Sequence, residues 1–339
     1  GAGIPTSIVR VVVAPALLRI VRGTPNTAEL SASLIALAKL GSARAGEPLL
    51  PELVAFLAHP SLPVAEAATL GIGILGEDRG AATLMELAID TPVGHGLCGR
   101  SSTPVRLRSF AIYGLGLIGA RSMDPDLQGR LVATLLPLVE NDDEARPDVV
   151  AAAITSLGLT ELPWRSAPGQ TSVTRPELIR RLGGFLQGDA RRVGRTRHAH
   201  ARAQIPIALA RLHQDAGPLN QGEVAETGAR MLELLETGST EESALVRQSI
   251  LIALGRLANS GGKGSTLEDL NGRAHAALSR ASARAPHELT RRFALIALAR
   301  QAGRPGDGPS PLALLEPTEQ LLLDRLDGGP RRETHWAAL

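Results

Sequence analysis

Two residues that could act together in catalysis lie in the segment DTPVGHGLCGRSSTP (90–104). Cys98 is the only cysteine of the chain, and His95 precedes it by three residues. A thiolate activated by an imidazole is a known covalent nucleophile, but it needs an orienting acid and donors for an oxyanion. Asp90 is the only acidic residue nearby in the sequence. We therefore predict no catalytic residues and no enzyme. An enzyme or enzyme-assembly factor that uses His95 and Cys98 is the alternative.

The same residues offer little to a metal ion. A structural zinc ion takes four ligands, of which His95 and Cys98 would supply two. His198 and His200 are two positions apart, which places them on different faces if the segment is helical. A single cysteine also excludes a disulfide within the chain. We predict no metal site.

Two glycine motifs match the spacing of a dinucleotide-binding turn. GIGILG (71–76) and GLGLIG (114–119) both read G-x-G-x-x-G, and Asp90 follows the first at about the distance of a ribose-binding acid. Such a turn has to follow a β-strand. The preceding PVAEAATL (63–70) is rich in alanine and lacks strand alternation, so it predicts a helix. We predict no nucleotide and no other cofactor.

The most basic part of the chain is residues 175–202, with eight arginines and two acids. Arg191, Arg192 and Arg195 lie at its centre and could contact phosphates. The segment has no aromatic residue after Phe185, which disfavours nucleic acid. The interpretations left open are a solvated loop, an acidic protein partner and, as a less favoured alternative, a nucleic-acid-binding surface.

A second candidate for binding is the insert GLTELPWRSAPGQTSVT (158–174). It carries Trp164 beside Arg165, and this pair has the composition of an interface anchor. The other interpretation is that Trp164 folds over the edge of its own repeat.

All of these segments lie within one repeating pattern. A large aliphatic residue recurs seven times, with a small residue on each side of it, at Leu37, Ile72, Leu115, Leu157, Leu209, Leu254 and Leu298. Glycine costs a helix about 1 kcal/mol relative to alanine, so we interpret the glycines as a structural seam where helices approach closely. The seam glycines are Gly71, Gly73, Gly114, Gly116, Gly158 and Gly255. Because other copies use alanine there, we expect alanine to be tolerated.

Each seam helix is preceded by another amphipathic helix. These first helices are predicted at residues 7–22, 47–58, 80–89, 126–140, 175–187, 223–236, 266–281 and 316–326. Ser265 and Glu268 form a predicted capping box, and Pro206 should kink or shorten the fifth seam helix.

Helix pairs at this period resemble HEAT repeats, including the PBS-lyase-like branch of that family. LVRQSILIALGRLA (245–258) is the closest match to the second helix of that family, and VRLRSFAIYGLGLIG (105–119) and LTRRFALIALARQAG (289–303) follow it well. The resemblance implies an all-α, right-handed solenoid of about seven and a half helix pairs over residues 1–339. It also implies a non-catalytic scaffold that binds another protein through its concave surface and inter-helix loops. RRETHWAAL (331–339) repeats the motif only in part, so we expect the native protein to continue beyond residue 339.

A row of basic residues is predicted on the second helices. Two positions after the recurring aliphatic, the last three repeats carry Arg211, Arg256 and Arg300, and the first repeat carries Lys39. The middle repeats have apolar residues there. The resemblance implies that this position lines the concave side. A partner with acidic groups is the expectation for the C-terminal half.

The overall composition limits the remaining possibilities. Of 36 basic residues 34 are arginine, which indicates a GC-rich, bacterial genome, and the net charge is only +2. That charge points to neither nucleic acid nor a membrane surface. No apolar run reaches the length of a membrane span. The first residue is not Met, so a cytoplasmic location is only favoured over a periplasmic or secreted one, and the oligomeric state is not predicted.

Overall fold

The computed structural model describes residues 5–141, 146–165, 173–187, 199–237 and 244–328. It divides into two compact units, Gly1–Arg175 and Pro176–Leu339. Every regular element within the described ranges is a helix and none is a strand, which confirms the predicted all-α class.

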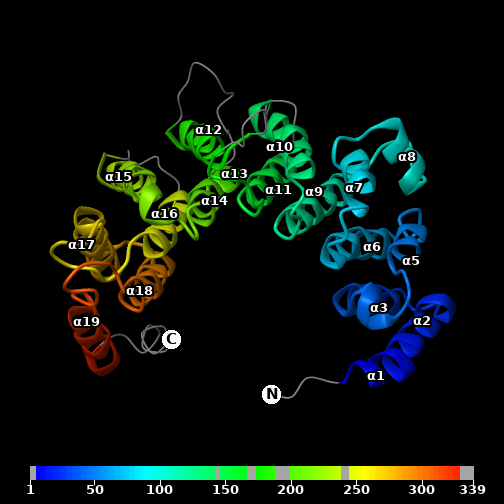
Figure 1. Ribbon diagram of the computed structural model, residues 1–339, viewed down its shortest axis with the longest axis horizontal. Helices are drawn as coiled ribbons and strands as arrows, with labels where there is room; N and C mark the ends of the chain where they lie inside the picture. Colours follow the sequence, from blue (N-terminus) through cyan, green and yellow to red (C-terminus); the bar gives the residue numbers. More distant parts are fainter. Residues whose placement is uncertain (1–4, 142–145, 166–172, 188–198, 238–243, 329–339) are drawn as a thin grey trace. The chain divides into compact units, whose positions relative to one another are not determined.

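Helix pairs stack on one another in the first unit (Figure 1). The second helices of successive repeats, which carry the seam, pack side by side, and the first helices lie against them. The elements in chain order are α1 (Thr6–Ile8), η1 (Val9–Val13), α2 (Ala14–Gly23), α3 (Thr27–Leu40), α4 (Ser42–Ala45), α5 (Leu50–Ala55), α6 (Leu62–Leu75), α7 (Gly80–Ala88), α8 (Pro92–Cys98), α9 (Val105–Gly119), α10 (Pro125–Glu140) and α11 (Pro147–Leu157). The second helices among them are α3, α6, α9 and α11.

The second unit repeats this plan. Its second helices α14, α16 and α18 pack in series, and α17 lies against α18 (Figure 1). The elements are α12 (Arg175–Gln187), which begins at the last residue of the first unit, α13 (Ala199–Arg202), α14 (Ile205–Leu212), η2 (Pro218–Asn220), α15 (Gln221–Thr237), α16 (Ala244–Leu257), α17 (Glu268–Arg284), α18 (Glu288–Ala302) and α19 (Leu315–Gly328).

The predicted first helices agree with the observed ones to within a few residues, and α12 has the predicted bounds. Pro206 lies in the first turn of α14, so the second helix of the fifth repeat is shortened, as predicted. The Ser265–Glu268 capping box is wrong, because Glu268 begins α17 and its carboxylate accepts from the Gly264 N–H instead. The incomplete eighth repeat (331–339) lies outside the described residues.

Three seam glycines face the next second helix across a backbone contact. A Cβ on Gly73 would lie 2.2 Å from Gly114 Cα, and one on Gly116 would lie 2.7 Å from Ser156 Cα. A Cβ on Gly255 would lie 2.6 Å from the carbonyl oxygen of Ala297. No Cβ fits at such distances unless the helices move apart, so the expectation that alanine is tolerated at these three positions is wrong.

The other seam glycines have different surroundings. A Cβ on Gly71 would meet Leu53 of α5 at 3.2 Å, and one on Gly114 would meet Leu84 of α7 at 2.8 Å. These neighbours are side chains of first helices. Gly158 is the C-cap residue of α11. The seam therefore brings second helices together and also lets the first helices lie close against them.

A carboxylate connects two loops of the second unit. Asp307 accepts hydrogen bonds from Ser265 Oγ at 2.5 Å, from the Thr266 N–H at 3.0 Å and from Thr266 Oγ1. The hydroxyl of Ser265 is the main cause that lowers the pKa of Asp307 to about 2, from an ordinary value of 3.8. The ionised form is therefore the one that holds the loops together.

Stability of the second unit should depend on the charge of Asp307 in acid. A carboxylate whose pKa is lower in the folded chain stabilises it above pH ~4 and loses that contribution as the pH falls toward 2. Asp307→Asn should therefore unfold at a lower temperature than the parent at pH 6. The two melting temperatures, followed by circular dichroism, should converge by pH ~2. A difference that stays constant from pH 6 to pH 2 would contradict this role.

Candidate functional site

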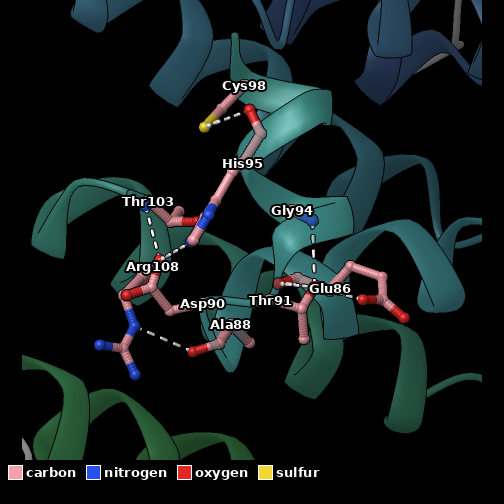
Figure 2. Close-up of polar contacts among 9 residues, drawn as sticks. All are labelled: Glu86, Ala88, Asp90, Thr91, Gly94, His95, Cys98, Thr103 and Arg108. Carbon is pink, nitrogen blue, oxygen red and sulfur yellow. Dashed lines mark hydrogen bonds and ion pairs between the residues drawn. The ribbon is translucent and has the colours of Figure 1, made fainter. Parts of the chain in front are cut away.

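The segment with His95 and Cys98 forms a helix rather than a loop. After α7 the chain turns at Asp90, which has a positive φ of 58°, and α8 follows. The hydroxyl of Thr91 caps α8 by accepting from the Gly94 N–H at 3.0 Å (Figure 2). Thr91 also donates to the Glu86 carboxylate. Asp90 and Thr91 thus hold the insert against the end of α7.

The Asp90 carboxylate orients the imidazole of His95. Its Oδ1 accepts from the Thr103 N–H at 2.6 Å and lies 2.9 Å from His95 Nε2 (Figure 2). Burial acts to raise the pKa of Asp90, but these hydrogen bonds and the charge of Arg108 outweigh it and lower that pKa. An ionised carboxylate can only accept, which assigns a proton to His95 Nε2.

Cys98 is turned away from that imidazole. Its thiol is fully buried and lies 3.5 Å from the main-chain carbonyl oxygen of His95, to which it donates (Figure 2). A nucleophilic cysteine has to reach its base and its substrate. At the predicted His95–Cys98 pair, the structure places the Asp90 carboxylate beside the imidazole of His95. The thiol of Cys98 is not accessible to a substrate.

Trp164 lies against Arg175, the first residue of α12. The guanidinium of Arg175 lies 5.2 Å from the centre of the Trp164 ring, and its Nε donates to the carbonyl oxygen of Leu162 at 2.9 Å. Arg175 also forms an ion pair with Glu161 at 2.9 Å. Arg165 is exposed beside them. The described ring contact of Trp164 is with α12, the first helix of the following repeat, so both interpretations of Trp164 stay predictions.

Apart from Arg165 and the arginines of the last three repeats, the structure describes only Lys39 among the predicted basic residues. Lys39 is exposed in the last turn of α3, and the residues at the equivalent position of the next repeats are apolar. Arg191, Arg192 and Arg195 lie outside the described residues. Within the described ranges no group of three metal-ligating side chains occurs, and no helix there combines the length and apolar character that crossing a bilayer requires.

Three arginines come together in the second unit, and we call them the arginine row: Arg211, Arg256 and Arg300. Each lies in the last turn of its helix, on α14, α16 and α18 respectively. These helices pack in series, so the three side chains project from neighbouring helix ends. Arg256 and Arg300 line a cavity of about 690 Å³. This volume is typical of ligand-binding pockets.

The arginine pocket, as we call this cavity, has one further cation and one acid in its wall. Arg304 follows α18, and Asp215, which has a positive φ of 64°, follows α14. Val224, Leu257 and Leu267 supply apolar wall. Among the described residues, no Phe, Tyr or Trp side chain is part of this lining.

The arginine row has no acidic counterpart in the described part of the chain. Elsewhere arginines such as Arg22 and Arg106 pair with a glutamate. None of the row's guanidinium groups lies within ion-pair distance of a described carboxylate. Burial, followed by the charges of Arg300 and Arg211, lowers the pKa of Arg256. The Nε of Arg256 is buried without a hydrogen-bond acceptor.

The negative end of each helix dipole accounts for part of this arrangement. Main-chain carbonyls at a helix C-terminus favour a cation by about 0.3–1 kcal/mol. Burial is the main cause of the lowered pKa of Arg256, and repulsion by the charges of Arg300 and Arg211 lowers it further. An anion in the arginine pocket would relieve that repulsion. Sequence spacing identified the row, but it could not identify the cavity, Arg304 or Asp215.

Among known proteins, this chain is similar to solved structures. No family model matches this chain. No curated protein matches it either. Human deoxyhypusine hydroxylase in complex with glycerol is similar at a TM-score of 0.35 and 16% identity, over 98% of this chain and 96% of that one. An engineered protein from a structural genomics programme is similar at a TM-score of 0.40 and 14% identity, over 99% of this chain and 80% of that one. These likenesses are consistent with a HEAT-like helical repeat.

The first of these proteins corrects the predicted function. We expected a non-catalytic scaffold and no enzyme, because repeat stacks rarely concentrate catalytic groups. That expectation is contradicted, because the protein that is similar over 96% of its own length is by name a hydroxylase, which is an enzyme. At such low similarity its reaction is not transferred to this chain.

Proposed function

We propose that the second unit recognises an anionic ligand in the arginine pocket, and that this ligand is an acidic polypeptide. The observation that carries the proposal is the arginine row, whose three guanidinium groups lie on neighbouring helix ends without a described carboxylate partner. Carboxylates form strong, often bidentate hydrogen bonds with arginine. Such a polypeptide can be bound as a substrate or as a lasting partner.

The spread of the three arginines over successive helices favours a polypeptide ligand over a single small anion. Packed helices lie about 8–10 Å apart, so the three cations are spread over roughly 20 Å. One small anion cannot neutralise charges so far apart, whereas a chain with several carboxylates can. A nucleic-acid strand has the charge, but single-strand sites usually add aromatic side chains on which bases stack. The lining that the structure describes for the pocket has no such side chain.

Binding of a labelled deca-glutamate peptide to the full chain tests this proposal. Fluorescence anisotropy should show binding at about 50 mM salt that weakens severalfold at about 200 mM, because surface charges are then screened. The double variant Arg256→Glu/Arg300→Glu should lower the affinity at least tenfold, because it replaces two attractive charges by repulsive ones.

The matched control is Arg19→Glu combined with Arg79→Glu. Both arginines are exposed in the first unit, and the control has the same net charge as the test variant. It should retain the parent affinity. Equal losses in the two variants, or no binding at low salt, would overturn the proposal. Circular dichroism of each variant verifies that it is folded.

A further inference from the structure

A second row of side chains runs beside the arginine row on the same helices. Each of its members lies four residues before one of the arginines, and side chains four apart lie on the same face of a helix. All three are only partly buried. We call this the isoleucine row: Ile207, Ile252 and Ile296.

The apolar surface continues toward the other ends of α16 and α18. Leu245 and Leu289 lie eleven residues before Arg256 and Arg300, which is close to three full helical turns, so they share the same face. They are 47% and 44% exposed, respectively. An apolar strip thus lies beside the arginine row on the second helices of this unit. Exposed apolar side chains grouped in this way are expected of a binding surface rather than of a solvated ridge.

The spacing of the rows distinguishes between possible occupants. Neighbouring second helices lie about 8–10 Å apart. On a bound α-helix, residues seven apart lie on one face and are separated by about 10.5 Å, which matches this interval. On a bound β-strand, residues on one face are about 6.6 or 13 Å apart, and neither distance matches. The rows therefore fit a helix that crosses α14, α16 and α18.

We propose that the arginine and isoleucine rows together bind an amphipathic α-helix with acidic side chains every seventh residue and apolar side chains next to them. The inference rests on the proposed anion binding of the arginine row and adds the conformation and apolar character of the ligand. The acidic residues face the arginines, and the apolar residues cover the isoleucines. Charge complementarity and the parallel apolar strip identify this occupant.

A pair of designed peptides tests the inference against the full chain. The test peptide is a labelled alanine- and glutamine-based helix of about three heptads, with a glutamate in each heptad and a leucine four positions after each glutamate. The control peptide has the same composition, but each leucine stands two positions after its glutamate and so lies on another face. We expect the test peptide to bind at least tenfold more tightly than the control.

Variants of the protein separate the two proposals. Ile252→Gln combined with Ile296→Gln should weaken the test peptide about tenfold and leave deca-glutamate within twofold of the parent value. Arg256→Glu/Arg300→Glu should weaken both ligands. If deca-glutamate binds but the two designed peptides bind equally, the helix inference fails and anion binding stands. If neither deca-glutamate nor the test peptide binds, both fail. An oligothymidylate that binds more tightly than the test peptide would also overturn the inference.

Discussion

Gly73→Ala is expected to destabilise the first unit by about 3 kcal/mol, the upper part of the range for overpacking. The new Cβ would lie 2.2 Å from Gly114 Cα, where the obstacle is main chain and cannot rotate away. Helices α6 and α9 would have to separate, and that loosens their packing with α3 and α11. Chemical denaturation followed by circular dichroism measures the loss.

Gly129→Ala is the matched control within the same unit. Gly129 lies inside α10, and a Cβ there would meet nothing within 4 Å. Alanine should therefore stabilise the helix by up to about 1 kcal/mol through its higher propensity. The same chemical change thus has opposite signs at the two sites. Equal stability of Gly73→Ala and the parent would show that α6 and α9 do not make this main-chain contact.

Arg256→Met is expected to raise the stability of the second unit while it removes most of the binding of acidic peptides. The folded chain disfavours the Arg256 charge, because burial and the charges of Arg300 and Arg211 lower its pKa. Methionine has a similar length and removes both costs. The free energy of unfolding should therefore be higher for Arg256→Met than for the parent. The affinity for deca-glutamate should fall about tenfold.

Arg106→Met provides the contrast. Arg106 pairs at 2.9 Å with Glu66, whose side chain is almost fully buried, so its loss leaves a buried carboxylate without its cation. That variant should be less stable than the parent and should bind deca-glutamate normally. If Arg256→Met proves less stable than the parent, Arg256 is a structural residue of α16 and the arginine pocket loses its main support.

The helices themselves could be predicted from the sequence. A large aliphatic between two small residues, repeated seven times, located the second helices, and the amphipathic segments between them located the first helices, α12 with its observed bounds. These features are local, since helical periodicity and the exclusion of large side chains are encoded within some fifteen residues. The same argument correctly rejected a nucleotide-binding turn at Gly71 and placed Pro206 at a shortened helix.

Side-chain directions and main-chain contacts were decided by the tertiary structure. His95 and Cys98 are three residues apart, yet Asp90 orients the imidazole while the buried thiol donates to a main-chain carbonyl. The sequence pattern treated glycine and alanine as equivalent in the seam, although a Cβ on Gly73 would lie only 2.2 Å from Gly114 Cα.

The sequence by itself determined the helical repeat and the position of the arginine row within it. Only the tertiary structure decided that the row borders a cavity, that Asp215 and Arg304 share this cavity, and that no described carboxylate pairs with the row. The physical reason is range. Helix formation and amphipathicity depend on neighbours along the chain, whereas cavities, many charge pairs and close contacts between helices depend on residues from different elements that only packing brings together.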